Sequence, residues 1–278
     1  MENRVVGSIL TAAGVLTFAL VPLAQRPSAP ASERAKAIPD LSGIWNASGG
    51  ALVSGPGAYR PAPRDGQGGI PSNRFTREEP PMQPSALQSF KAARAGRGPE
   101  ERPREQVDQL FYPYCMPHGF PRVYTTPLAL EIVQTTNQVY MLFEASNMVR
   151  RIYLDGRKHL EGWVPTFTGV SHGKWDGDTL VVETDNILSL DGHSWIDSFG
   201  HPFSDSLRVT ERIRRVSHDS LQIDLLFDDP KTYTKPWGGR KLFQLQPTWD
   251  MTDYEACEDH LREDFLRDLR AGKPAGRP

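Results

Sequence analysis

The stretch GVSHGKWDGDTLVVET, residues 169–184, decides the fold class. It holds two short strand-like runs on either side of Asp176-Gly177-Asp178. An Asp-Gly pair between two such runs is the strongest short-range signal for a β-hairpin turn. The stretch therefore predicts two antiparallel strands joined by a tight turn.

Strand-like runs of the same kind, separated by turn residues, surround this hairpin. They cover residues 130–134, 139–144, 149–154, 206–216, 220–227 and 242–246. Gly43-Ile44-Trp45 precedes them and is typical of a first strand whose tryptophan closes one end of a barrel. Many short strands without helices between them predict a mainly β fold, either a sandwich or an antiparallel β-barrel.

Composition divides the chain into segments. Residues 1–24 combine Arg4 with a long uncharged apolar run, which predicts a signal peptide. The same run is long enough to serve as an uncleaved membrane anchor, and this alternative stays open. Residues 25–40 are a linker rich in Pro, Ala and Ser. The barrel domain is expected over residues 41–258, with a Pro- and Gly-rich insertion over residues 49–106.

Two helices are expected beside the strands. Residues 84–95 begin with a proline, carry Leu87 and Phe90 on one side, and are followed by Gly96 as a stop. Residues 252–270 begin with a capping box, Thr252-Asp253-Tyr254-Glu255. We expect the first helix to dock on the barrel and the second to be a C-terminal helix.

The charge balance excludes some classes of partner. The 278 residues include 32 Lys and Arg against 34 Asp and Glu, a net charge of −2, with no long run of one sign. Such a chain has neither a nucleic-acid footprint nor a polybasic membrane surface. We expect a small-molecule partner and no membrane contact beyond the N-terminal signal or anchor. The sequence does not predict the oligomeric state.

Export affects the expected state of the two cysteines, Cys115 and Cys257. A signal peptide places the folded part in the periplasm or outside the cell, where an oxidising environment lets an even pair of cysteines join. We therefore predict a disulfide between them; the alternative is two buried thiols that never meet. Neither cysteine lies in a CxxC motif or beside a histidine, so thiol catalysis is not expected.

Six strings of the chain resemble the motifs of a family of exported bacterial proteins of unassigned activity. They are DLSGIW (40–45), CMPHG (115–119), IYLDGR (152–157), WDGDTLVVET (175–184), SDSLRVTER (204–212) and DPKTYTKPW (229–237). The resemblance covers about residues 40–258 and implies no catalytic residues. The Gly-x-Trp start before a run of strands is also similar to lipocalins. That likeness implies a lipocalin-like, calycin-type barrel with a cavity for a small, partly apolar ligand.

Strand alternation picks out Glu211 as a candidate acid or base. Leu207, Val209, Glu211 and Ile213 share one face of the expected strand, so the carboxylate is placed among apolar neighbours. A carboxyl group that loses hydration in this way can act as a general acid or base near neutral pH. Arg151 is the expected partner, either polarising a substrate or holding Glu211 in a purely structural ion pair.

The long link between the strands at residues 185–205 is the second candidate region, because long loops at a barrel mouth are often functional. His201 with Asp205 is the preferred proton-transfer pair, since a carboxylate fixes the imidazole tautomer and raises its basicity. His193 and Trp195 of the same loop are expected to contact substrate. His193 and His201 with one Asp have the donors of an open zinc site, but their spacing matches no tight template, so we predict no metal.

Four further side chains are expected to bind substrate. His172 and Trp175 lie in the expected hairpin strand, and either line the cavity or pack in the core. Tyr233 and Lys235 belong to the stretch YTKPW, whose aromatic rings and amine suit stacking and hydrogen bonding to a ring. The alternative is that Trp237 fills the barrel end while Lys235 is solvated.

Together these features predict an exported enzyme that needs no cofactor. We expect acid–base chemistry on a small, partly apolar or aromatic molecule, with a lyase or a hydrolase as the leading classes. No GxSxG elbow is present, which disfavours a serine nucleophile. The alternatives are a periplasmic carrier or sensor that uses the same pocket without catalysis, and a structural envelope module.

Overall fold

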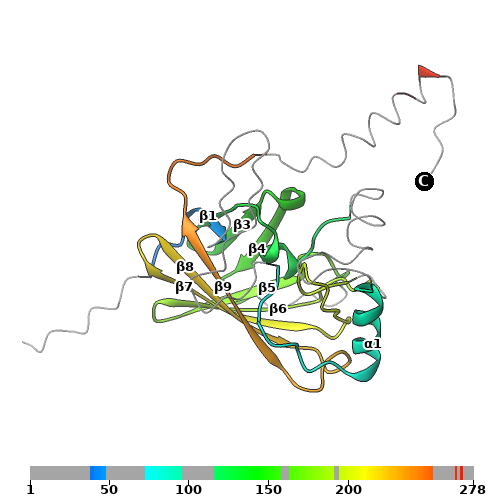
Figure 1. Ribbon diagram of the computed structural model, residues 1–278. Helices are drawn as coiled ribbons and strands as arrows, with labels where there is room; N and C mark the ends of the chain where they lie inside the picture. The colour runs from blue at the N-terminus through cyan, green and yellow to red at the C-terminus, as the bar shows by residue number, and fades with distance from the viewer. Residues whose placement is uncertain are drawn as a thin grey trace, which may run out of the picture. The chain divides into compact units, whose positions relative to one another are not determined.

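The structure is a computed structural model that describes residues 38–47, 73–95, 116–157, 163–190, 194–252, 267 and 270–271. Nine strands form a closed barrel in chain order, and the last strand pairs with the first (Figure 1). The strands are β1 (Gly43–Ala47), β2 (Leu130–Gln134), β3 (Gln138–Phe143), β4 (Met148–Tyr153), β5 (Val170–Asp176), β6 (Thr179–Asp185), β7 (Arg208–Ser217), β8 (Ser220–Asp228) and β9 (Trp237–Leu245). The predicted mainly β, lipocalin-like barrel is confirmed.

The barrel is mixed, whereas an all-antiparallel barrel was expected. β4 and β5 run parallel, with Ile152 opposite Ser171 and Tyr153 opposite His172. The other neighbouring pairs are antiparallel. A parallel pair needs a long crossover connection, and residues 154–169 supply one. The strand-like runs of the sequence predicted where the strands lie, but not that this connection brings β5 parallel to β4.

The strand positions agree closely with the sequence pattern, and Trp45 of β1 is fully buried as expected. The one large difference is β9, which begins at Trp237 and not at residue 242. Gly238 and Gly239 hid the strand, because glycine disfavours a strand interior. A Cβ atom on Gly239 would lie 2.4 Å from the Cβ atom of Phe75, so the missing side chain makes room for that residue.

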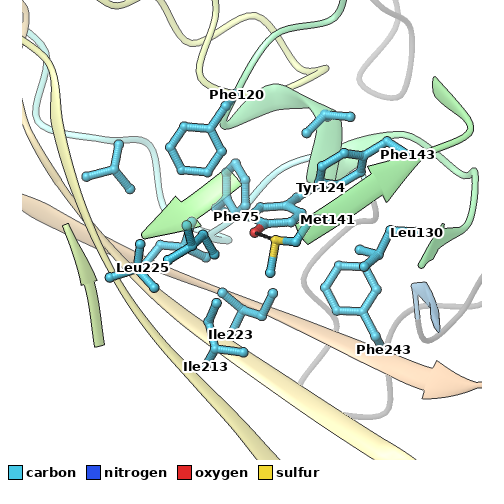
Figure 2. Close-up of a cluster of buried hydrophobic side chains, with 14 of the residues drawn as sticks. Phe75, Phe120, Tyr124, Leu130, Met141, Phe143, Ile213, Ile223, Leu225 and Phe243 are labelled. Atoms are coloured by element: carbon cyan, nitrogen blue, oxygen red, sulfur yellow. Dashed lines mark hydrogen bonds between the residues drawn. The ribbon is translucent and has the colours of Figure 1, made fainter. Parts of the chain in front are cut away.

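Side chains from outside the strands fill the barrel interior. Phe75 comes from the insertion, Phe120 from the connection before β2, and Tyr124 from the 3₁₀ helix η2 (Arg122–Thr125). All three are at most 1% exposed. Figure 2 shows the Tyr124 phenol pointing toward the sulfur of Met141 in the middle of this cluster, where its hydroxyl oxygen lies 3.1 Å from that sulfur.

Residues 73–83, here called the strap, bind β9 and the connection between β8 and β9. The amide of Arg240 donates to the Phe75 carbonyl at 3.0 Å, and the amide of Thr234 donates to the Pro81 carbonyl at 2.8 Å. The expected helix follows as α1 (Pro84–Ala93) and buries Phe90. The strap and α1 therefore belong to the barrel domain, although they come from the Pro- and Gly-rich insertion.

Several predictions fall outside the described residues. These are the signal peptide (1–24), most of the linker, His193, both cysteines and nearly all of the C-terminal helix, of which Arg267 and Arg270 are helical. None of the helices in the described ranges is long and apolar enough to cross a membrane. Export and the disulfide stay predictions.

Candidate functional site

Glu211 lies on the inner face of β7, as the alternation of its strand predicted, and is 0% exposed. Its partner is Arg150 and not Arg151. One guanidinium nitrogen of Arg150, Nη1, donates to Glu211 Oε1 at 3.1 Å, and Nη2 donates to Oε2 over a shorter distance. Arg151 points to solvent on the opposite face of β4. The expected pairing of Glu211 with Arg151 is therefore wrong.

The Arg150–Glu211 ion pair is embedded in a complete hydrogen-bond network. The Tyr124 hydroxyl donates to Glu211 Oε1 at 2.9 Å and is 2.8 Å from Nη1 of Arg150. Arg150 also donates to the hydroxyls of Ser171 (3.1 Å) and Thr184 (2.9 Å). Burial, reinforced by the charge of Glu211, raises the pKa of Tyr124 well above its ordinary value. The network anchors Tyr124 in the barrel interior as a neutral phenol.

A second cluster of ionisable groups lies where the strap meets the loop between β6 and β7. His201 is 0% exposed, and its Nδ1 is 2.6 Å from Oδ2 of Asp197, which is also 0% exposed. Its Nε2 is 3.1 Å from Oε2 of Glu79, whose side chain is 52% exposed. The three residues form a chain from a buried carboxylate through an imidazole to a carboxylate that reaches solvent.

The backbone near His201 holds Asp197 in place. Its Oδ1 accepts the amides of Phe199 (3.1 Å), Gly200 (3.0 Å) and His201 (3.2 Å). A carboxylate that caps consecutive amides has its orientation fixed by the turn itself. Oδ2 is thereby left facing the imidazole.

The electrostatics of this cluster keep His201 protonated at neutral pH. Burial by itself would lower the pKa of His201, but the charge of Asp197 and hydrogen bonds to Asp197 and Glu79 outweigh it and raise the pKa to about 9. The hydrogen bond to His201 lowers the pKa of Glu79, against the opposing effect of burial. At pH 7 the outer pair is therefore an imidazolium and a carboxylate.

Aromatic rings enclose the imidazole. The Phe90 ring of α1 stacks on His201 with centroids 4.9 Å apart and planes 11° apart. Phe199 lies at 5.4 Å and Trp237 at 6.1 Å from the imidazole centroid. These rings exclude water from three directions, which leaves the side of Glu79 as the polar approach to His201.

The expected pairing of His201 with Asp205 is wrong. Asp205 is exposed and accepts a hydrogen bond from Lys231 at 2.6 Å. It lines a polar surface pocket of about 600 Å³ together with Asp185, Arg208 and Asp228. Sequence analysis missed Glu79 altogether, because it lies in an irregular segment 122 residues from His201 in the chain. No local pattern marks such a contact.

The expected substrate-binding residues do not gather at one place. Trp175 packs against the core, whereas the half-buried His172 lies on the opposite face of β5, 6.1 Å from the Tyr153 ring. Trp195 and Tyr233 are buried, and Lys235 is exposed.

Trp237 is buried at the start of β9 and packs edge-on against Tyr233 at 5.4 Å. This matches the alternative in which Trp237 fills the barrel end and Lys235 is solvated.

Comparisons with known proteins give no further guidance. No protein-family model, no curated protein and no solved structure matches the chain. Within the described part of the chain, no three His, Cys, Asp or Glu side chains are arranged to hold a metal ion. The resemblance to a family of exported bacterial proteins stays a prediction, and function is argued from geometry alone.

Proposed function

We propose that the protein is an exported acid–base enzyme of the lyase class, with Glu79 as its catalytic base. The observation that carries this proposal is the chain Asp197–His201–Glu79, which couples a buried ion pair to one half-exposed carboxylate. His201 and Asp197 are positioning residues, because His201 binds Glu79 and lowers its pKa while Asp197 orients His201. Such coupled titratable groups with shifted pKa values are a common mark of acid–base sites.

The chemistry proposed for Glu79 is proton abstraction next to a carbonyl group. Oε2 of Glu79 is engaged with His201, so Oε1 takes the proton. The electrons of the broken C–H bond form the C=C bond of an enolate, whose negative charge rests on the carbonyl oxygen. When the enolate re-forms the carbonyl, a bond to a β-substituent breaks and leaves an unsaturated product. Glu79 returns its proton to the departing group, so that protons and electrons balance.

Surrounding residues support a small substrate with apolar character. Phe90, Phe199 and Trp237 enclose His201, and apolar surface beside a few fixed polar groups is typical of small-molecule sites. The acid–base role predicted for Glu211 has less support. Both of its oxygens are bound by Arg150, and Tyr124 covers one of them.

The experiment uses phenylpyruvate in D₂O and follows by proton NMR the exchange of the CH₂ group next to its keto group. Glu79→Gln removes the base and should lower the exchange rate by about 10²–10⁴-fold. Glu78→Gln changes the exposed neighbouring carboxylate and should leave the rate unchanged. Both variants should melt within a few degrees of the wild type, because Glu79 is half exposed.

Exchange at the wild-type rate in Glu79→Gln would contradict the proposal. Saturable binding of phenylpyruvate without any exchange above the protein-free rate would favour the carrier instead. The rate should also fall above about pH 9, where His201 loses its proton. That loss removes the positive charge that orients Glu79.

A further inference from the structure

The outer face of β2, β3 and β4 carries a contiguous group of apolar side chains. Val133 of β2 lies opposite Tyr140 of β3, and Leu142 of β3 lies opposite Val149 of β4. Val133 and Val149 are 39% and 47% exposed, and the other two are half-buried. The solvent face of a sheet is ordinarily polar, and contiguous apolar surface on it indicates a contact site. These four residues are here called the β2–β4 patch.

The chain leaves the barrel for its C-terminal segment at one edge of this patch. Met251 and Thr252 line a surface pocket of about 190 Å³ together with Leu142 and Val149. Oε1 of the buried Glu144 accepts hydrogen bonds from the amide and the hydroxyl of Thr252, both at 3.1 Å. The chain beyond Thr252 therefore starts beside the patch.

The sequence of residues 253–270 suits an apolar sheet face. The helix predicted there has an apolar stripe at helical spacing, made of Tyr254, Cys257, Leu261 and Phe265. Arg267 and Arg270, which the structure describes, are helical and exposed and lie opposite this stripe in helical projection. An isolated helix of this length is marginal in water, so the stripe needs a partner surface.

Glu144 is placed to support a helix that begins at Thr252. A carboxylate beside the first turn of a helix interacts favourably with the free amides and the dipole there. The Thr252 hydroxyl donates to Glu144, so its lone pairs stay available to the amide of Glu255, as the capping box requires. Oε2 of Glu144 accepts the amide of Ala129 at 3.0 Å. The barrel thus fixes an anion where the helix is predicted to begin.

The segments that carry the two cysteines are both anchored at the 3₁₀ helix η3 (Ala145–Asn147). His118, three residues after Cys115, donates its amide to the Ser hydroxyl of η3 at 3.2 Å. Thr252, five residues before Cys257, is bound to the residue directly before η3. Five helical residues span about 7.5 Å and three extended residues about 10 Å. Both segments are therefore long enough to bring the two Cα atoms within the distance that a disulfide needs.

We propose that residues 253–270 form a helix that docks its apolar stripe on the β2–β4 patch, where a disulfide joins Cys257 to Cys115. The bond forms when the two thiols lose two protons and two electrons to a small-molecule disulfide such as oxidised glutathione, which becomes two thiols. Because the segment starts beside the patch, it has a higher effective concentration there than a separate chain has. The occupant is therefore the chain's own C-terminal segment.

Hydrogen–deuterium exchange of the full chain, with its thiols reduced, tests the docking. The amides of residues 256–266 should exchange about tenfold or more slowly than in a synthetic peptide of residues 252–270. Val149→Asp puts a charge on the patch and should remove most of this protection. Leu226→Asp, on the outer face of β8 and also 47% exposed in the wild type, should leave it unchanged. Exchange at the peptide rate in the wild type, or protection that survives Val149→Asp, overturns the proposal.

A change on the helix side avoids any disturbance of the barrel strands. Leu261→Ser removes an apolar residue of the stripe and should expose the same amides to exchange. Glu263→Ser, on the opposite side of the predicted helix, should keep them protected. If the two variants exchange alike, the stripe does not dock and the proposal fails.

Peptide mapping without reductant, after incubation with oxidised glutathione, tests the disulfide. The wild type should yield Cys115 linked to Cys257 within one chain, and Val149→Asp should form this link about tenfold or more slowly. Free or glutathione-capped thiols at both positions overturn the proposed bond. A link between two chains, seen as a covalent dimer, overturns the proposal in favour of a second copy on the patch.

Discussion

Arg150 and Glu211 face each other inside the barrel as a two-pronged ion pair, with side chains 1% and 0% exposed. Removing the charge of one partner leaves the other buried without compensation, which costs about 3–5 kcal/mol. Glu211→Gln should therefore lower the free energy of unfolding by about that amount in urea titrations. Glu183→Gln, an exposed carboxylate on β6, should change it by less than about 0.5 kcal/mol.

The same variant decides between the two roles of Glu211. A Glu211→Gln protein with wild-type stability and no proton exchange would restore Glu211 as the acid or base that the sequence predicted. A destabilised protein that still exchanges protons would assign it to the structure alone.

Neighbouring arginines on β4 provide a second test, because they point to opposite sides of the sheet. Arg150→Gln leaves Glu211 without its ion pair and should cost about 3–5 kcal/mol. Arg151→Gln changes an exposed side chain and should cost less than about 0.5 kcal/mol. Urea unfolding of both variants measures the difference. Equal costs would mean that the assigned faces of β4 are wrong.

Why the sequence placed Glu211 correctly but not its partner is visible in the two strands. In β7, Val209 and Ile213 are apolar on the face of Glu211, as is Leu207 directly before the strand, while the other face carries arginines, so the buried face is unambiguous. In β4, each face carries one arginine, Arg150 or Arg151, together with apolar residues. The alternation of residues cannot show which face of such a strand points into the barrel. The pairing of Glu211 with Arg150 is therefore seen only in the folded structure.

The second cluster was half predictable for a different reason. The loop after β6 was recognised as a candidate region, and His201 was chosen within it. Asp197 and Asp205 stand equally far from His201 in sequence, on opposite sides. The amides that cap Asp197 decide between them, and a loop conformation of that kind has no periodic signal. Glu79 reaches the site through tertiary packing of the strap.

The free energy of unfolding should decrease at alkaline pH, because His201 loses its proton there. Its pKa is raised from 6.5 to about 9 in the folded protein, so folding favours the protonated imidazole. The stabilisation is fully present below pH 6.5, decreases as the pH rises, and is lost once the pH passes about 9. Its size is about 3 kcal/mol, from 1.36 kcal/mol for each unit of pKa shift. Urea unfolding between pH 6 and pH 10 measures it.

A matched pair of variants isolates this contribution from other titrating groups. His201→Gln should flatten the alkaline decrease, whereas His218→Gln, whose side chain is 83% exposed, should follow the wild-type curve. If wild type and His201→Gln lose stability in parallel between pH 6.5 and pH 9, then His201 does not carry a raised pKa and the charged chain to Glu79 is not formed.

Two adjacent glycines of β9 test whether the strap positions Glu79. In Gly239→Ala the new Cβ would meet the Phe75 Cβ at 2.4 Å and its backbone oxygen at 3.0 Å, so the strap must shift, at about 1–3 kcal/mol. In Gly238→Ala the nearest atom is 3.5 Å away, an ordinary contact, and stability should hold. Because Glu79 is on the strap, Gly239→Ala should also slow proton exchange and reduce the alkaline loss of stability. A Gly239→Ala protein that matches Gly238→Ala in all three measurements would show that Phe75 does not hold the strap.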